Sequence, residues 1–390
     1  MPTTRFKNMV YRAELPLRAP RLERSPKLQV SGEVRTLPEY IGLLRKNHVL
    51  GSSLLLKGGD RRAVVLCSSG NPPHPVREDS LYRVASITKM AASLAALAAV
   101  SEGKLDPESP VLPYFSGVSD IPSLRDVTLL HLLSHTSGLK DPPDLENALL
   151  SGKTFPEILK QDGTRVSPPG SEFHYSNLGF GLIGCLLEAV YDLPIPEIMD
   201  RLVFAPLGMN AYIDASALNP DRIVPITRIL PYRPGSDLLV TPLGKIPLNH
   251  PDPLRHYGHT AGAMYLDLRS LEKLTDCLQA GGAPLIPPEL GSGMTRKHAS
   301  YGKISPTLSY GLGMLIIRDS TLSEGRILGH QGFAYGCADG AFWEENSGRT
   351  VLFLNGGASE ARKGRLGLCN YDVLRWALRK EMPEWSGSMR

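Results

Sequence analysis

Ser86 and Lys89 stand three residues apart at the start of an apolar run, in the stretch YRVASITKMAASLAALAAV. On a helix, residues with this spacing share one face, so the amine of Lys89 would lie beside the hydroxyl of Ser86. A serine hydroxyl becomes a strong nucleophile when a base removes its proton, and a buried lysine that has lost its charge is such a base. Free backbone N–H groups at the helix start would stabilise an oxyanion. The pair therefore predicts nucleophilic catalysis by Ser86.

The same spacing also has a structural interpretation, in which Ser86 caps the helix and the amine of Lys89 reaches the solvent. Two downstream groups of residues favour catalysis instead. Tyr175-Ser176-Asn177 precede a segment with helical periodicity, and His330-Gln331-Gly332 lie on a predicted strand. Ser-x-x-Lys, then Tyr-x-Asn, then a basic residue two positions before a glycine is the arrangement of serine penicillin-recognising enzymes.

The chain therefore resembles the superfamily of serine β-lactamases and penicillin-binding proteins. The resemblance is to the branch that contains class C β-lactamases, D-Ala-D-Ala carboxypeptidases and β-lactamase-like esterases. Three more segments are similar to ones that this branch carries, namely YRVASITK, VTLLHLLSHTSGL and FAPLGM. The resemblance extends from about Leu37 to the C-terminal helix and leaves out the residues before 31.

The resemblance implies a role for each matching residue. Ser86 would be acylated, and Lys89 and Tyr175 would share its proton, with the pKa of the phenol lowered by the charge of the lysine. Asn177 would bind the acyl side chain of the substrate and the amine of Lys89. The backbone N–H groups of Ser86 and Phe333 would form the oxyanion hole.

The third group departs from the β-lactamase pattern at two positions, while Gly332 would let the substrate lie against the strand edge. His330 stands where β-lactamases have lysine. Because histidine is neutral or cationic near pH 7, its attraction for a substrate carboxylate is expected to depend on pH. Gln331 stands where many relatives have a Thr or Ser hydroxyl that holds this carboxylate. Both departures argue against β-lactams and free-carboxylate peptides as substrates, and the Pro-rich stretch 228–257 is expected to shape a separate pocket.

The other histidines have structural interpretations. His131 and His135 have the i, i+4 spacing of a metal-binding pair, but no acidic or cysteine ligand accompanies them, and His135 is expected to hydrogen-bond a turn. His174, His256 and His259 are expected at the surface or in structural contacts. The five cysteines are scattered without CxxC or Cys–His spacing, which argues against a disulfide framework and a zinc knuckle. We expect neither a metal nor a cofactor.

The elements that position these residues follow from periodicity and turn residues. LPEYIGLLRKNHV has helical spacing, and GSSLLLKGGDRRAVVLCSSG has the pattern of a hairpin. Helical patterns with Pro- and Gly-rich loops fill residues 105–306. Strand patterns return in LSYGLGMLIIRDS, RILGHQGFAYGCADGAFWEENSG and RTVLFLNGG, and CNYDVLRWALRKEM closes the chain as a helix.

Strands at both ends and helices between them predict an α/β (α+β) fold. An antiparallel sheet flanked by helices is built from both chain ends and carries a large, mostly helical insertion. The expected parts are a basic N-terminal arm over residues 1–31, a sheet domain over 32–105 plus 307–390, and a helical insertion over 106–306. The resemblance implies a β-lactamase/transpeptidase-like fold, with the site in the cleft between sheet and insertion.

Composition argues against several classes of function. The 390 residues are 42% hydrophobic and 21% charged, and the formal net charge is only +4. Part of that charge lies in the N-terminal arm, which lacks the aromatic spacing of a nucleic-acid-binding stripe. No apolar run reaches membrane-spanning length, and no secretory signal is visible. We therefore expect no nucleic-acid or membrane partner and a cytoplasmic location, or a secreted or periplasmic one if a leader has been removed. An oligomer is compatible with the sequence.

The sequence thus predicts a serine hydrolase that forms an acyl-enzyme at Ser86 on a small-molecule or peptide-like ester or amide. It would act as an esterase or as a D-amino-acid peptidase or amidase. An acyltransferase or peptide cyclase stays open, because an amine or alcohol in place of water would serve the same site. A ligand-binding or sensor module on the same fold also stays open, although binding alone does not need Ser86, Lys89 and Tyr175 together.

Overall fold

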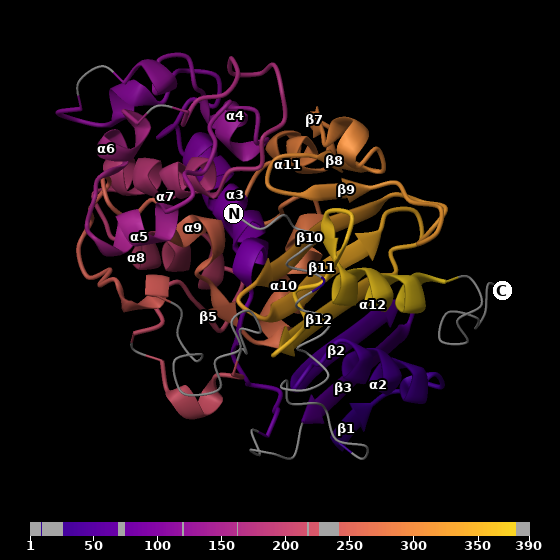
Figure 1. Ribbon diagram of the computed structural model, residues 1–390. Helices are drawn as coiled ribbons and strands as arrows, with labels where there is room; N and C mark the ends of the chain where they lie inside the picture. Colours follow the sequence, from indigo (N-terminus) through magenta and orange to yellow (C-terminus); the bar gives the residue numbers. More distant parts are fainter. Residues whose placement is uncertain are drawn as a thin grey trace.

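The computed structural model describes Met9 and residues 26–68, 75–118, 121–161, 163–216, 218–225 and 242–379. Its largest element is a nine-stranded sheet in which neighbouring strands are antiparallel (Figure 1). The strands, in their order across the sheet, are β1 (Lys27–Ser31), β3 (Arg61–Ser68), β2 (Gly51–Gly58), β12 (Thr350–Gly356), β11 (Cys337–Glu344), β10 (Ile327–Ala334), β9 (Leu315–Ile317), β8 (Leu308–Tyr310) and β7 (Ala299–Ser300).

Both ends of the chain build the centre of this sheet. β2 and β3 form the hairpin that the sequence predicts, around a turn in which Gly59 has a φ of +57°. β12, from the other end of the chain, pairs with β2 along its whole length and places Leu352 opposite Leu55. Both leucines are fully buried, so this pairing lies in the core. The predicted fold class is confirmed.

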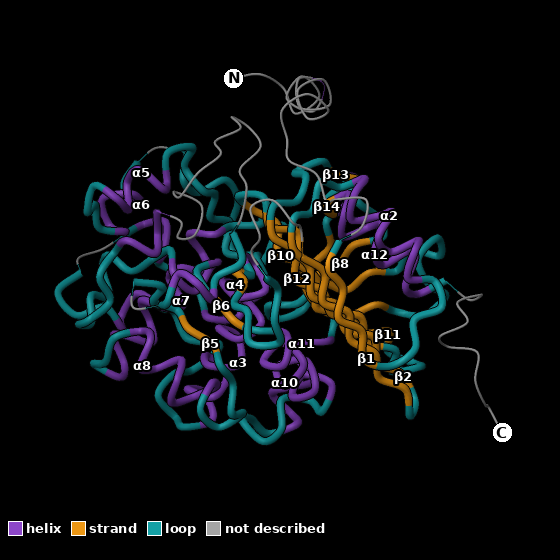
Figure 2. The backbone as a smooth tube through the Cα atoms, turned by 90° about the horizontal axis from the view of Figure 1, so that it is seen from below, coloured by secondary structure: helices purple, strands orange, loops and turns teal. Residues whose placement is uncertain are grey.

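Helices cover both faces of the sheet. The two predicted terminal helices, α2 (Leu37–Lys46) and α12 (Leu368–Leu378), pack together on one face. There the rings of Tyr40 and Trp376 stack with their centroids 5.0 Å apart. α10 (Leu268–Gln279) packs against β2, β11 and β12 from the opposite face. Figure 2 shows the sheet between these two layers.

The helical part of the molecule surrounds α3 (Thr88–Ser101). This helix is apolar on all sides and buried along almost its whole length, as expected of a central core helix, and Lys89 lies in its first turn. The other helices are α4 (Leu129–Leu133), α5 (Leu145–Leu150), α6 (Phe155–Leu159), α7 (Asn177–Tyr191), α8 (Ile195–Met199), α9 (His259–Gly262) and α11 (Pro288–Thr295). Two small pairings complete the fold, a sheet of β4 (Tyr82–Arg83), β6 (Tyr265–Leu266) and β5 (Ala211–Tyr212), and a hairpin of β13 (Arg362–Lys363) and β14 (Leu366–Gly367).

The structure differs from two predicted domain boundaries and from the number of strands in two predicted segments. The last residues of the expected arm form β1, because an extended segment satisfies the outer backbone groups of β3. Residues 1–8 and 10–25 lie outside the described residues. The helical insertion ends before 306, because β7 already belongs to the large sheet and α10 packs on that sheet. Two of the predicted strand segments each fold as a hairpin, β8 with β9 and β10 with β11.

No single helix in the described residues is both long and apolar enough to cross a membrane. One bent pair of helical segments, Asn177–Tyr191 and Ile195–Phe204, passes that test on length and composition. Most of α7, its first member, is buried inside the protein.

Candidate active site

Ser86 lies in a tight turn between β4 and α3. Residues Ala85–Ile87 form one 3₁₀ turn, in which Ala85 has a φ of +44°. That conformation costs a residue with a Cβ on the order of 1–3 kcal/mol. The hydroxyl of Thr88 fixes the turn, because it donates to the backbone O of Ala85 at 2.6 Å and accepts from the N–H of Met264 at 3.1 Å. The N–H of Ser86, in the first turn of the helical segment, has no intrahelical acceptor.

Lys89 is fully buried, and three oxygen atoms surround its amine. Nζ lies 3.1 Å from Oγ of Ser86 and donates to Oδ1 of Asn177 at 3.0 Å and to the backbone O of Ala261 at 2.6 Å. Burial lowers the pKa of Lys89 to about 7. A large fraction of the amine is therefore uncharged at neutral pH, which is the property the sequence analysis expects of a lysine base.

Tyr175 lies in contact with Ser86, as Lys89 does, so the three predicted catalytic residues meet. The hydroxyl of Tyr175 donates to Oγ of Ser86 at 2.9 Å. Its ring centroid lies 4.9 Å from Nζ of Lys89. The prediction that the lysine lowers the pKa of this phenol is wrong. Burial raises the pKa of Tyr175 well above its ordinary value, and the hydrogen bond to Ser86 offsets only part of that effect. The phenol is therefore a proton donor at neutral pH.

Asp141, which the sequence analysis missed, holds the start of α7. Its carboxylate accepts hydrogen bonds from the backbone N–H groups of Asn177 and Leu178 at 3.0 and 2.9 Å, and from Oγ of Ser176 at 2.8 Å. It also accepts from Nδ2 of Asn177 at 2.9 Å, which turns Oδ1 of that amide toward Lys89. No local spacing marks Asp141, because its partner Ser176 is 35 residues away in the sequence.

Replacement of Asp141 by alanine is expected to lower the free energy of unfolding by about 2 kcal/mol, because the first N–H groups of α7 lose their acceptor. Urea unfolding followed by circular dichroism measures the change. Asp267→Ala, which removes the N-cap of α10 and its bond from the N–H of Ser270, is the matched control. An Asp141→Ala protein as stable as the wild type would contradict the assigned role.

Strand β10 presents a free edge beside Ser86. β9 pairs with β10 only from Ile327 to Gly329, so among the described strands none continues along that edge at residues 330–334. β10 packs against the turn that carries Ser86. The strand therefore leaves backbone groups facing the nucleophile.

The turn at the end of β10 sets which backbone groups these are. Tyr335 and Gly336 have φ values of +55° and +85° and join β10 to β11 as a two-residue hairpin. Hydrogen-bonded and non-hydrogen-bonded pairs alternate from such a turn, so the N–H of Phe333 points away from β11. Ser86 and Phe333, the predicted oxyanion-hole residues, line one cavity.

Gly332 makes room for the turn that carries Ser86. A Cβ at this position would lie 2.3 Å from the backbone O of Val84 and 3.0 Å from Oδ2 of Asp339. Only glycine lets β10 approach the residues before Ser86 this closely. The predicted reason for this glycine, space for substrate at the strand edge, stays a prediction; the structure adds close packing of β10 against Val84 as a second reason.

His330 is buried and hydrogen-bonded within the protein. Its Nδ1 donates to the backbone O of Gln331 at 2.7 Å, and its Nε2 accepts from the hydroxyl of Tyr310 at 3.0 Å. Burial, reinforced by the charge of Lys89, lowers the pKa of His330 to about 3. The ring is therefore neutral at physiological pH. The expected pH-dependent attraction between His330 and a carboxylate is wrong, because the sequence gives no measure of this burial.

The side chain of Gln331 lines the cavity, but its polar atoms are used by the protein. Nε2 donates to the backbone O of Arg365 at 2.9 Å, and Oε1 accepts from the N–H of Gly367 at 2.9 Å and from Nδ2 of Asn370 at 3.2 Å. Gln331 thereby ties β14 and the start of α12 to β10. The hydroxyl that many relatives place here has no counterpart in this chain.

Most of the other histidines for which the sequence predicts a structural role have structural contacts. His135 is buried under Tyr175, with ring centroids 4.2 Å apart, and its Nδ1 accepts from the N–H of Ser176 at 3.1 Å. His131 belongs to the capping box of α4. His256 and His259 are buried rather than exposed, and His174 lies beside Glu172. Within the described ranges, no group of three or more His, Cys, Asp or Glu is arranged to hold a metal ion.

A cavity of about 530 Å³ opens at Ser86. Its volume is within the range of small-molecule sites. Asp141 and Glu146 line one part of it, and the exposed residues Arg362 and Arg365 line another. Leu243, from the predicted Pro-rich stretch, also lines it, whereas residues 226–241 of that stretch lie outside the described residues.

The fold and the contacts of Ser86 define a serine hydrolase. The chain belongs to the Beta-lactamase family, whose model matches residues 43–365. It is 27% identical to Esterase EstB of Burkholderia gladioli over 393 aligned residues, which cover 85% of this chain and 92% of that protein. Comparisons with solved structures agree on the fold.

Two of these structures illustrate the agreement. The octameric penicillin-binding protein homologue of Pyrococcus abyssi superposes with a TM-score of 0.69 at 19% identity, over 88% of this chain and 76% of that one. The D-amino acid amidase of Ochrobactrum anthropi SV3, complexed with L-phenylalanine, superposes with a TM-score of 0.67 at 22% identity, over 84% of this chain and 92% of that one. The predicted family and enzyme class are thus confirmed.

Proposed function

We propose that this protein hydrolyses small-molecule esters through an acyl-enzyme on Ser86. The observation that carries the proposal is the meeting of two proton-transferring groups at one hydroxyl, with Nζ of Lys89 at 3.1 Å and the hydroxyl of Tyr175 at 2.9 Å from Oγ of Ser86. The family match favours neither acyl transfer nor a non-catalytic binding module.

In the acylation step, Oγ of Ser86 attacks the ester carbonyl carbon while the uncharged amine of Lys89 takes its proton. The carbonyl oxygen becomes an oxyanion that accepts hydrogen bonds from the N–H groups of Ser86 and Phe333. When the ester C–O bond breaks, the departing alkoxide takes a proton from Tyr175, and the ammonium of Lys89 restores the phenol. Asn177 holds the acyl side chain. Water then attacks the acyl-enzyme by the reverse transfers and releases the acid.

Two features support an ester over a substrate recognised by its free carboxylate. The neutral ring of His330 has no charge to attract such a group, and the polar atoms of Gln331 are bonded to Arg365, Gly367 and Asn370. The relative EstB, which spans nearly the whole chain, is named an esterase. Two exposed cations, Arg362 and Arg365, also line the cavity and would attract a negatively charged group elsewhere on an ester substrate.

The proposal predicts that p-nitrophenyl acetate and a fluorophosphonate each add their acyl or phosphonyl group to Ser86. Intact mass spectrometry followed by peptide mapping locates the adduct, and Ser86→Ala is expected to show none. A transient acetyl adduct with steady release of p-nitrophenol, and a longer-lived adduct with penicillin, would distinguish an esterase from a β-lactamase. A folded protein that forms no adduct with any of these reagents would refute the proposal.

A further inference from the structure

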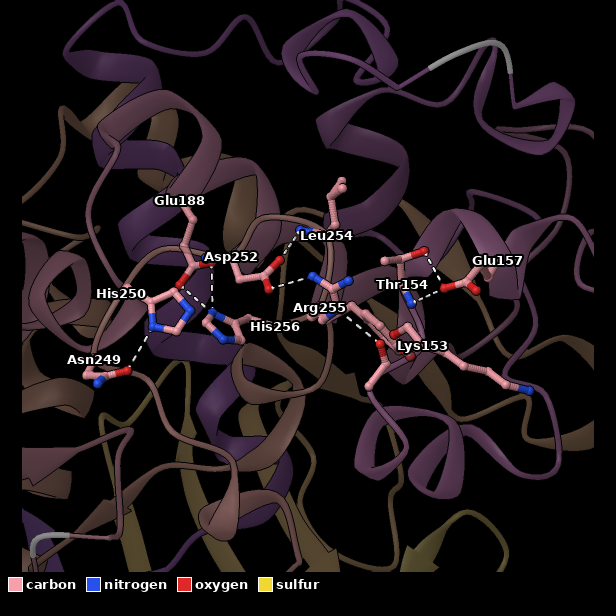
Figure 3. A network of polar contacts seen from close by, with 12 residues as sticks. Lys153, Thr154, Glu157, Glu188, Asn249, His250, Asp252, Leu254, Arg255 and His256 are labelled. Carbon is pink, nitrogen blue, oxygen red and sulfur yellow. Dashed lines mark hydrogen bonds and ion pairs between the residues drawn. The ribbon is translucent and has the colours of Figure 1, made fainter.

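A second buried polar cluster lies at the far end of α7, away from Ser86 (Figure 3). The side chain of Glu188 is fully buried, and that of His256 is only 4% exposed. The carboxyl of Glu188 accepts hydrogen bonds from three N–H groups: Nδ1 of His256 at 2.8 Å, and the backbone of Ile195 and Asp252, each at 2.9 Å. Every one of these contacts uses Glu188 as the acceptor.

The segment held by Glu188 leads directly into α9. The backbone O of His256 accepts from the N–H groups of Gly258 and His259 at 2.9 and 3.4 Å, so His256 fixes the entrance to this short helix. The hydroxyl of Thr260 then donates to the backbone O of Phe180 at 2.7 Å, which ties α9 to α7.

The end of α9 supplies the shortest contact of the catalytic amine. Ala261 follows Thr260, and its backbone O accepts from Nζ of Lys89 at 2.6 Å. α7 thus acts on two contacts of that amine. Asn177, at the start of the helix, accepts from Nζ directly, and Glu188, near its end, holds the segment that leads to Ala261. The same segment packs closely on α7, because a Cβ on Gly181 would lie 1.6 Å from the backbone O of Tyr257.

We propose that Glu188 and His256 are positioning residues, which clamp residues 252–262 to α7 and thereby hold the carbonyl of Ala261 against Lys89. The inference rests on the proposed function in one respect only, that Lys89 serves catalysis. No local pattern in the sequence indicates it, because Glu188 and His256 are 68 residues apart.

The groups around Glu188 and His256 determine which substitutions would break the clamp. His250 and His259 face His256, with ring centroids 6.3 and 5.6 Å away, and Asp252 lies beside Glu188. Glutamine at position 188 would direct an amide N–H at one of the three N–H donors, so an isosteric change breaks the clamp. Asparagine at position 256 keeps a donor close to the place of Nδ1.

The test compares Glu188→Gln, His256→Ala and His256→Asn with the wild type. Arg255→Gln is the matched control, because Arg255 neighbours His256 and its exposed side chain contacts Asp252 and the backbone O of Gly152 on the outer side of the same network (Figure 3). Circular dichroism and cooperative urea unfolding establish that each variant folds. If Glu188→Gln does not fold, His256→Ala carries the same test.

Two readouts separate positioning from a purely structural role. Ester hydrolysis by Glu188→Gln and His256→Ala is expected to lose about 10²-fold in kcat with KM almost unchanged, because the base is misplaced while the cavity wall is kept. In protein labelled with ¹³Cε-lysine, the Lys89 signal, identified by its absence in Lys89→Met, is expected to titrate about one pH unit lower once the carbonyl acceptor is lost. His256→Asn and Arg255→Gln are expected to resemble the wild type in both readouts.

Folded Glu188→Gln and His256→Ala proteins with the wild-type titration of Lys89 would overturn the inference, and so would a rise confined to KM. The lysine titration needs no turnover. A wild-type protein that forms no adduct on Ser86 would therefore refute the proposed function while the titration still decides whether the clamp holds Lys89.

Discussion

Replacement of Lys89 by methionine is expected to slow the acylation of Ser86 strongly and, at acidic and neutral pH, to make the protein more stable. Loss of the general base is expected to slow acylation by about 10³-fold or more. In the wild type, kcat/KM for an ester is expected to rise with pH through about 7, the pKa to which burial lowers Lys89, and to level off above it. The raised pKa of Tyr175 places no second rise below pH 10.

The stability effect follows from the proton balance of Lys89. Its pKa of about 7 in the folded protein lies below the value near 10.4 of an unperturbed lysine in the unfolded chain. Between these two values the unfolded chain binds more protons, so the wild-type free energy of unfolding rises with pH across that window. Below pH 7 the full cost remains, on the order of 4 kcal/mol. Methionine removes this cost but loses three hydrogen bonds of the amine, each worth about 1 kcal/mol.

We therefore expect Lys89→Met to be more stable than the wild type by about 1–2 kcal/mol at pH 6, and less stable above about pH 8. Urea unfolding at pH 6, 8 and 10 measures both curves, and stopped-flow release of p-nitrophenol measures acylation. Ser86→Ala, which keeps the lysine, serves as the control and should follow the pH dependence of the wild type. A stability difference that does not vary between pH 6 and pH 10 would show that Lys89 is charged in the folded protein.

The second large effect is expected from Gly332→Ala. The added methyl group would meet the backbone O of Val84 at 2.3 Å, so either β10 or the turn before Ser86 has to move. Because the two proposed oxyanion donors, the N–H groups of Ser86 and Phe333, lie on these two segments, the distance between the donors changes. Loss of one such donor costs about 10²–10³-fold in kcat, and the overpacking costs about 1–3 kcal/mol of stability.

Steady-state kinetics and urea unfolding measure the two consequences of Gly332→Ala. Gly42→Ala, on α2, is the matched control, because a Cβ there meets nothing within 4 Å and alanine favours a helix. The control is expected to be fully active and slightly more stable than the wild type. Wild-type kcat in a folded Gly332→Ala protein would show that the close approach of β10 to Val84 is not needed for catalysis.

The parts of the site that lie on local patterns were predictable from the sequence. Ser86 and Lys89 are neighbours on one turn, as their spacing predicts, and Tyr175 and Asn177 stand at a helix start, where the resemblance to the family implied a role for both. The hairpin of β2 and β3 and the terminal helices were also predictable, because alternation and helical periodicity are properties of short segments.

What the sequence could not provide depends on tertiary contacts. Asp141 reaches α7 across 35 residues, and Glu188 reaches His256 across 68, so no short window contains either interaction. Burial raises the pKa of Tyr175 and lowers that of His330, which keeps the ring of His330 neutral. The sequence shows which charges lie nearby but not how deeply a side chain is buried, so the direction of the Tyr175 shift and the neutrality of His330 could not be predicted. The edge strand β1 was missed although Leu28 and Val30 alternate with polar residues, because this pattern covers only five residues next to the basic arm.

The pairing of β2 with β12 also constrains how the protein folds as it is made. The hairpin of β2 and β3 is synthesised long before its partner Thr350–Gly356. Until then the inner edge of β2, with buried leucines such as Leu55, has no strand to pair with. Long-range strand pairing of this kind folds slowly and exposes surfaces that aggregate. Premature termination before β12 therefore yields a chain without the strand that joins the hairpin of β2 and β3 to the rest of the sheet. Yields of native protein are expected to depend on chaperones that cover the unpaired hairpin.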